Sequence, residues 1–210
     1  MAVQDLAILC REEGERLINF STDYVFGGGK NTPYREEDTP EPIQVYGISR
    51  LAGEYAALAA APQHAVIIRT CGLYGTSGAQ SKGGNFVDKR IHEAHNCASF
   101  EMSCEQIVSP TYTDDLSRAL LDIIDHQEFK PGIYHLVNEG ECSWYEFTIA
   151  IFEIMGINIK VKPVDRGGMS GEMRRPVYSA LANTKARALG IILPQWRDGL
   201  ERYLKEKYYS

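Results

Sequence analysis

The amino-acid sequence predicts an α/β protein in which a short parallel sheet is followed by a smaller, mixed α/β lobe. Two observations carry this prediction. The apolar runs at 16–21 (RLINFS) and 65–70 (AVIIRT) are typical of buried strands, and the Ala- and Leu-rich stretch 44–60 between them is typical of a helix. A strand, a helix and a strand in that order form a βαβ unit, which implies parallel strands and a right-handed crossover.

The first part of the chain, residues 1–74, adds a helix and a long loop to this unit. Val3, Leu6 and Leu9 belong to a set of apolar residues with helical spacing, and Gly14 is placed to end that helix. Residues 27–42 are predicted to be a loop because they are rich in glycine, proline and acidic residues.

Residues 75–210 are predicted to form most of the second lobe, and some of their strands can return to the first sheet. The predicted elements are a Gly/Ser loop at 75–84, a helix at 85–96, a strand near 99–107, a helix behind Pro110 with a Thr/Asp cap, a strand at 132–138, a helix that an S-x-x-E capping box opens at 143–146 and that ends at Met155, a strand at 159–164, and a terminal helix in 193–204.

Composition excludes several classes of function. The formal charge of −6 and the lack of a basic stripe argue against nucleic-acid binding. No apolar run approaches the ~18 residues of a membrane span. The N-terminus does not read as a signal peptide, because it has no basic segment ahead of an apolar one. The five cysteines form no C-x-x-C pair and the five histidines no metal-ligand pattern, so we expect reduced thiols, no metal and a cytoplasmic protein.

Tyr46 and Arg50 are the first candidate catalytic residues. They lie four positions apart at the start of the predicted helix, so their side chains share a face. A tyrosine ordinarily titrates near ~10, and a neighbouring cation lowers that pKa. Such a tyrosine can give a proton to a carbonyl oxygen as hydride reaches the carbon. The alternative is a surface pair with no chemical role.

Ser21 and Thr22 are the second candidates, because STDYVF ends the preceding strand, where α/β sheets place functional side chains. Either hydroxyl could bind the carbonyl oxygen that Tyr46 protonates. The alternative is that the two residues only form a turn.

Several motifs in order resemble the dTDP-4-dehydrorhamnose reductase family of the extended short-chain dehydrogenase/reductase superfamily. They are STDYVFGG, PYREEDTPEPIQVYGISRLAGE, IIRTCGLYG, NFV, EQIVSPTYTDDLSRAL, GIYHLVNEGECSWYEF, RRPVYSALANTK and LPQWRDGLERYL. The resemblance implies an incomplete Rossmann-like sheet, NADPH or NADH as cofactor, and reduction of the 4-keto group of a dTDP-sugar. Thr22 then polarises the carbonyl, Tyr46 is the general acid, Arg50 stands at the family's lysine position, and Ser21 and Cys71 join Tyr46 and Arg50 in binding the cofactor.

The second lobe resembles the family's sugar-nucleotide domain. The resemblance implies substrate contacts by Tyr24, Asn85, Phe86, Gln106, Arg174 and Arg175. Each polar candidate also has a simpler interpretation: Asn85 could cap a helix, Gln106 could bind backbone, and the arginines could be solvated charges. Related dehydratases carry Thr-Asp-Glu at the strand end, whereas here Asp23 is followed by Tyr24, which disfavours dehydration.

The sequence departs from the family in three places. The chain is expected to begin at the family's fourth Rossmann helix, so the glycine-rich turn that holds the cofactor pyrophosphate is absent. Gly27, Gly28 and Gly29 do not replace that turn, since they precede a polar loop rather than a helix. Arg50 keeps the positive charge but not the contacts of an ammonium. Gly72 stands where well-studied members hold a tryptophan beside the sugar.

Two functions therefore stay open. The first is a reductase whose activity is impaired. The second is a non-catalytic binding or regulatory protein, resembling the β subunit of methionine adenosyltransferase. In either case strand 16–21 is expected to be an exposed edge that a second copy or a partner chain could cover.

Overall fold

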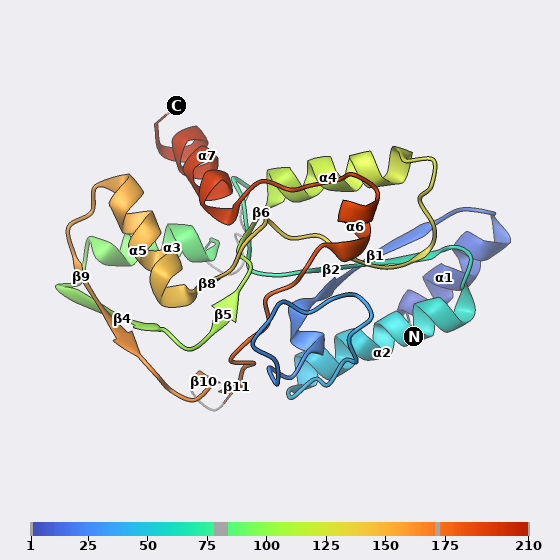
Figure 1. The fold of residues 1–210 in the computed structure, drawn as a ribbon, viewed down its shortest axis with the longest axis horizontal. Coiled ribbons are helices and arrows are strands. Elements are labelled where there is room, and N and C mark those ends of the chain that lie inside the picture. The colour runs from blue at the N-terminus through green and yellow to red at the C-terminus, as the bar shows by residue number, and fades with distance from the viewer. Residues whose placement is uncertain (1, 78–83, 171–172, 210) are drawn as a thin grey trace.

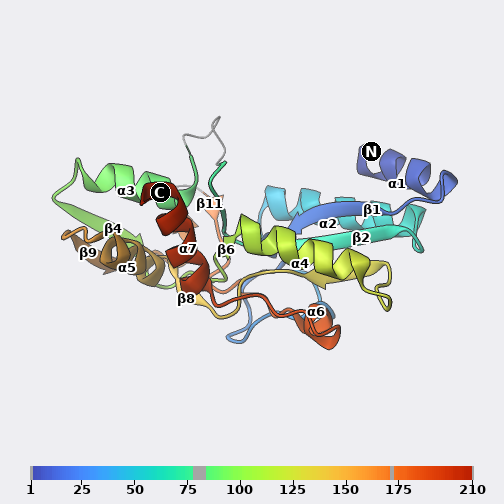
Figure 2. The same ribbon diagram turned by 90° about the horizontal axis from the view of Figure 1, so that it is seen from above.

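The computed structural model describes residues 2–77, 84–170 and 173–209, and Figures 1 and 2 show two lobes side by side. The first lobe holds a parallel sheet of three strands in the order β1 (Leu17–Thr22), β2 (Ala65–Thr70) and β7 (Gly132–His135). Leu17 pairs with Ala65, and Val66 with Gly132. The predicted βαβ unit is confirmed, with β7 as a later strand beside β2.

Helices cover both faces of this sheet (Figure 1). On one side lie α1 (Ala2–Glu12) and α2 (Val45–Ala60), packed on Ala65 and Ile67 of β2. On the other side lie α4 (Thr113–Asp125) and the short α6 (Thr184–Ala188), packed on Val66 and Ile68. Because successive side chains of β2 point to opposite faces, all six residues of this strand are buried.

Strand β1 lies at the edge of the sheet within the described part of the chain. Its first four residues are half-buried or exposed, and the side chain of Phe20 is 41% exposed. Its last two residues, Ser21 and Thr22, are buried and lead into the 3-10 turn η1 (Asp23–Val25). The carboxyl end of β1 is therefore covered although its outer edge is open.

The second lobe is built from short strand pairs and three helices. The parallel pairs are β3 (Leu73–Tyr74) with β6 (Thr111–Tyr112), and β4 (Ser99–Ser103) with β9 (Lys160–Val164). The antiparallel pairs are β5 (Ile107–Val108) with β8 (Cys142–Ser143), and β10 (Met169–Ser170) with β11 (Met173–Arg174). The helices are α3 (Phe86–Ala94), α5 (Trp144–Met155) and α7 (Trp196–Tyr208).

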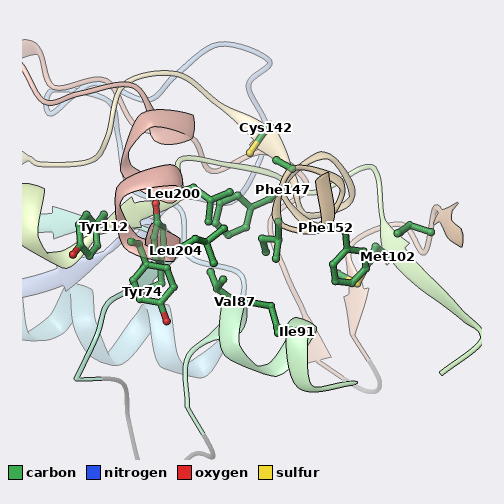
Figure 3. Close-up of a cluster of buried hydrophobic side chains, with 14 of the residues drawn as sticks. Tyr74, Val87, Ile91, Met102, Tyr112, Cys142, Phe147, Phe152, Leu200 and Leu204 are labelled. Carbon is green, nitrogen blue, oxygen red and sulfur yellow. The ribbon is translucent and has the colours of Figure 1, made fainter. Parts of the chain in front are cut away.

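The core of this lobe is aromatic. Figure 3 shows Tyr74, Phe147 and Leu200 meeting Val87 of α3 between the three helices. Tyr74 and Tyr112 stack with ring centroids 5.8 Å apart, so the strand pair β3–β6 is part of this core. Burial of these side chains keeps the second lobe together without any disulfide among the described residues.

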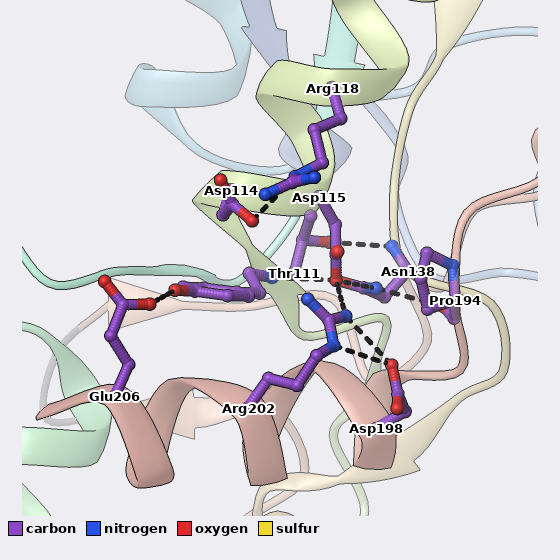
Figure 4. A network of polar contacts seen from close by, with 10 residues as sticks. Thr111, Asp114, Asp115, Arg118, Asn138, Pro194, Asp198, Arg202 and Glu206 are labelled. Carbon is purple, nitrogen blue, oxygen red and sulfur yellow. Dashed lines mark hydrogen bonds and ion pairs between the residues drawn. The ribbon is translucent and has the colours of Figure 1, made fainter. Parts of the chain in front are cut away.

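A polar network joins the terminal helix to the first lobe (Figure 4). The carboxylate of Asp115 in α4 accepts hydrogen bonds from Asn138 Nδ2 and from Arg202 Nη2, each at 2.7 Å. The Oδ1 atom of Asn138 accepts from the backbone N–H of Tyr112 at 2.8 Å. Elements distant in sequence therefore meet at one buried carboxylate.

Most predicted elements are confirmed, including the capping box of Ser143 and Glu146 and the end of α5 at Met155. The predicted cap of α4 is wrong: Tyr112 is its N-cap and makes no side-chain cap bond, while Thr113 is the first helical residue. The strand predicted near 99–107 is two strands, and the strand predicted at 132–138 ends at His135. The loop predicted at 75–84 lies mostly outside the described residues.

None of the helices among the described residues is long and apolar enough to cross a membrane. No group of three acidic, His or Cys side chains among these residues could hold a metal. All five cysteines are free.

Candidate active site

The first turn of α2 lies directly against the turn that follows β1. A Cβ atom on Gly47 would come 2.1 Å from the backbone oxygen of Tyr24, so only glycine permits this contact. Glycine therefore brings Tyr46 beside the end of β1. The rings of Tyr24 and Tyr46 meet edge to face, with centroids 6.2 Å apart, and the Tyr46 side chain is 52% exposed.

Thr22 lies at the end of β1 with its hydroxyl in a defined position. The hydroxyl oxygen accepts a hydrogen bond from the N–H of Tyr24 at 3.2 Å and donates to Oδ1 of Asp23 at 3.0 Å. A hydroxyl has one proton and can rotate, so Thr22 can redirect its hydrogen bond to a ligand oxygen.

Asp23 is a buried acid behind Thr22 that the sequence analysis did not name as a site residue. Its carboxylate also accepts from the Ser179 hydroxyl at 2.6 Å, and the thiol of Cys71 is a further partner. Burial raises the pKa of Asp23, and these hydrogen bonds oppose the increase. Asp23 thus links the ends of β1 and β2 to the C-terminal segment near 179. The sequence feature that could have identified Asp23 as a site residue is an acid directly after an apolar strand.

Tyr24 and Cys71 are the candidates from the neighbouring turn and strand end. Burial raises the pKa of Tyr24 to about 12, and the charge of Asp23 acts in the same direction while Arg175 opposes it. Burial, followed by the charge of Asp23, raises the pKa of the Cys71 thiol well above its ordinary value. Both groups are therefore neutral at physiological pH. The substrate contact of Tyr24 and the cofactor contact of Cys71 stay predictions.

Ser21 points beneath α2 instead of along the strand with Thr22. Its hydroxyl donates a short hydrogen bond to Oε1 of Glu54, a fully buried residue of α2. Glu54 also pairs with the buried guanidinium of Arg69 in β2, with Nη2 and Oε2 2.6 Å apart. A cofactor contact of Ser21 would have to use the hydroxyl oxygen as an acceptor, and this contact stays a prediction.

Arg50 follows Tyr46 by one helical turn and is half-buried. Its Nε atom is buried without a hydrogen-bond partner among the described residues, and the same holds for Nε of Arg175. A buried guanidinium nitrogen without an acceptor is costly, so both arginines are suited to an anionic or hydroxyl-bearing ligand.

A cavity of about 350 Å³ lies in the second lobe, and Arg175 is one of the residues that line it. Three predicted substrate residues line it: Phe86, the buried Gln106, and Arg175. Trp144 completes an aromatic wall, with its ring centroid 4.4 Å from that of Phe86. Two more arginines, Arg90 and Arg166, and one acid, Glu101, also line the cavity. Arg166 pairs with Glu101 at 3.4 Å, and the lining as a whole carries a net positive charge.

Tyr24 does not line this cavity, and neither do two further predicted substrate residues, Asn85 and Arg174. Asn85 is the N-cap of α3, where its Oδ1 accepts from the N–H of Asp88 at 3.0 Å and its Nδ2 donates to Gly75 and Tyr203. The capping interpretation of Asn85 is thus confirmed. Arg174 is exposed in β11. Substrate contacts by these two residues stay predictions.

Gly72 lies between β2 and β3 and packs against Trp144, which lines the cavity. It has a φ of 55°, and a Cβ atom there would lie 3.1 Å from Cα of Pro110 and 3.4 Å from Cη2 of Trp144. The indole of Trp144 thus occupies the space beside Gly72. The aromatic side chain beside Gly72 thus comes from Trp144, the first residue of α5.

Known proteins resemble this chain over nearly its whole length. The family described as the RmlD substrate binding domain matches residues 1–209. A dTDP-4-dehydrorhamnose reductase from Sinorhizobium fredii is 38% identical over 210 residues, which cover 95% of this chain and 69% of the relative. The chain belongs to the dTDP-4-dehydrorhamnose reductase family.

Two further known proteins extend the likeness. A crystal structure of the reductase from Bacillus anthracis, in complex with NADP, has a TM-score of 0.88 and 34% identity, and the match covers 97% of this chain and 70% of that one. The spore coat polysaccharide biosynthesis protein SpsK of Bacillus subtilis is 37% identical over 92% of this chain. The match covers 65% of the SpsK length.

Proposed function

We propose that this chain carries the site of an NAD(P)H-dependent reduction in which the 4-keto group of a dTDP-deoxysugar becomes a hydroxyl, as in the conversion of dTDP-4-dehydrorhamnose to dTDP-L-rhamnose. The observation that supports it best is the continuity between Tyr46 and the charged cavity. Tyr46 contacts Tyr24, Tyr24 lies in the field of Arg175, and Arg175 lines the cavity. A nucleotide bound at Arg175 could therefore extend its sugar toward Tyr46.

The residues have complementary chemical roles in this proposal. The Thr22 hydroxyl rotates away from Asp23 and donates a hydrogen bond to the ketone oxygen, which draws electron density from the carbonyl carbon. The phenol of Tyr46 gives its proton to the same oxygen. The positive charge of Arg50 stabilises the phenolate that remains, because it lies one helical turn away.

The cofactor is proposed to be NADPH or NADH, which supplies a hydride to the carbonyl carbon when bound. The half-buried guanidinium of Arg50 lies one helical turn from the half-exposed Tyr46 and is a suitable donor to a ribose hydroxyl there. No strand followed by a glycine-rich turn and a helix occurs in the sequence, so we expect this chain to hold the pyrophosphate weakly. The chain alone is thus proposed to be an impaired reductase, and saturable micromolar binding of NADPH in calorimetry would contradict that part of the proposal.

The reaction is tested directly with dTDP-4-dehydrorhamnose and NADPH. NADPH consumption is followed by absorbance, and the sugar nucleotide by mass spectrometry for a gain of two hydrogens. We expect slow turnover that Tyr46→Phe abolishes while thermal stability stays unchanged, since the Tyr46 ring is retained and its side chain is half exposed. Turnover of the Tyr46→Phe variant at the parent rate would exclude Tyr46 as the acid.

A second candidate function is binding of another protein, which the open edge of β1 favours. Phe20 is exposed on this edge strand, and an unpaired strand can add a strand from another chain. A second copy or a different partner would then cover it. Light scattering of the purified chain and of a Phe20→Lys variant tests whether a second copy covers this edge: a parent dimer that the variant dissociates supports self-association.

A further inference from the structure

The carboxylate of Glu54 is fully buried beneath the candidate active site. Glu54 follows Arg50 by one turn and Tyr46 by two turns of α2, so the three side chains share one face of the helix. Tyr46 is half exposed and Arg50 half-buried, whereas Glu54 has no exposed surface. The face therefore begins at the surface and ends in the core.

Glu54 is joined to both strands that this helix covers. Its Oε1 atom accepts from the hydroxyl of Ser21 in β1 and from Nε of Arg69 in β2, the latter at 3.0 Å. Its Oε2 atom accepts from Nε and Nη2 of Arg69, at 3.2 and 2.6 Å. A forked guanidinium held at both nitrogens has one orientation, so these bonds define the position of the carboxylate along the strands.

The two partners lie next to residues of the site. Ser21 precedes Thr22, and Arg69 is two residues before Cys71. Ser21 and Arg69 are themselves paired in the register of β1 and β2. The bond between Glu54 and Ser21 joins α2 to the end of β1. A displacement of Glu54 would therefore move Tyr46 relative to Thr22.

The pair is held in a buried environment. The side chain of Arg69 is 1% exposed, and its guanidinium lies 5.2 Å from the ring centroid of Phe26. Its Nη1 atom has no hydrogen-bond partner among the described residues. Removal of the Glu54 charge would leave a buried cation without its counter-ion.

We propose that Glu54 is a positioning residue that sets the distance between the Tyr46 phenol and the Thr22 hydroxyl through Ser21 and Arg69. Its effect on turnover rests on the proposed reductase function, whereas its effect on the helix does not. A misplacement of about 1 Å in an active site can cost roughly 100-fold in rate.

Four variants separate positioning from stability. Glu54→Gln removes the charge and keeps the shape. The double variant Glu54→Leu with Arg69→Met replaces the buried ion pair by apolar side chains of similar size, which restores stability in many proteins. Glu54→Asp keeps the charge on a shorter side chain. Asp115→Asn is the matched control, because it breaks another buried carboxylate–arginine pair, with Arg202 of α7 (Figure 4).

The first measurement is hydrogen–deuterium exchange, which needs no activity. We expect Glu54→Gln to accelerate exchange of the amides in 45–52, and Asp115→Asn to leave them at the parent rate while accelerating those of α4 and α7. Equal acceleration throughout the sheet and helices in Glu54→Gln, or none in 45–52, would overturn the proposal.

The second measurement is reduction kinetics. We expect Glu54→Gln to lower kcat by about 10- to 100-fold with KM unchanged, and Glu54→Asp to recover part of it. The double variant should recover the thermal midpoint but not kcat, because no carboxylate holds Ser21. Recovery of kcat with the midpoint would show that Glu54 acts only through stability. If the parent chain has no turnover, the reductase proposal fails and the exchange data alone decide the role of Glu54.

Discussion

Two tyrosines of the site differ in burial, and this difference separates their roles. Burial raises the pKa of Tyr24 to about 12, so its hydroxyl remains protonated under all physiological conditions. It can bind a ligand oxygen but is a poor proton donor in a reaction. Tyr46 is half exposed at the start of α2, with Arg50 one turn away. The acid of the proposed reaction is therefore Tyr46, and the ring of Tyr24 contacts it.

The charge of Arg50 gives a prediction at the same scale. Arg50→Met should lower kcat by about 100-fold or more, within the usual range for loss of acid–base assistance, because no cation would then stabilise the phenolate. Arg50→Lys should stay within about tenfold of the parent rate, since the charge is kept although the fork is lost. Steady-state kinetics with saturating NADPH checks both variants. Equal losses in the two variants would show that the guanidinium shape matters, not the charge.

At the scale of elements, the contact between α2 and the turn after β1 depends on one glycine. Gly47→Ala should destabilise the protein by about 1–3 kcal/mol, because its Cβ would overlap the backbone oxygen of Tyr24. Gly53→Ala on the same helix is the matched control: the nearest atom to its Cβ lies 4.0 Å away, so the change should stabilise by about 0.5–1 kcal/mol. Urea denaturation measures both. A stable Gly47→Ala variant with full activity would contradict the close contact.

Elements with a clear period were predictable from the sequence, and contacts between elements were not. The bounds of β2 and α5 agree with the apolar run at 65–70 and the capping box at 143–146, because both signals are local. The predicted cap of α4 was wrong because Thr113 is the first helical residue instead of the N-cap. α6 was missed since its five residues are too few for a period. Asp23 and Glu54 were missed because their partners are 156 and up to 33 residues away in the chain.

At the scale of the whole molecule, the loop before α2 and the C-terminal segment cross the outer side of β7. The N–H of Tyr34 donates to the oxygen of Ala180 at 2.8 Å, and the N–H of Ala182 donates to the oxygen of Tyr34 at the same distance. Beneath them, the ring of His135 in β7 pairs through Nδ1 with the oxygen of Tyr34 at 3.1 Å. These bonds connect the first lobe to the segment that carries Arg175.

His135 makes the stability of this assembly depend on pH. Burial lowers its pKa to about 3, and the charge of Arg69 acts in the same direction. The unfolded chain takes up a proton near ~6.5 that the native histidine does not, so the free energy of unfolding falls with decreasing pH in this window, by at most about 1.4 kcal/mol per pH unit. Denaturation at pH 6.5 and 5.0 should show this loss, and His135→Gln should remove it. His92→Gln, at an exposed position, should retain the loss. The same slope in His135→Gln would assign it to other groups.

The proposed function depends most on binding of the substrate nucleotide in the cavity lined by Phe86, Gln106 and Arg175. Calorimetric titration of dTDP into the chain tests it without cofactor or turnover. We predict saturable binding that Arg175→Gln weakens by about 10- to 100-fold, the usual cost of a lost charge-assisted hydrogen bond, while Arg118→Gln, at an exposed position of α4 outside the cavity, has little effect. No binding of dTDP, or equal weakening by the two variants, would contradict the account.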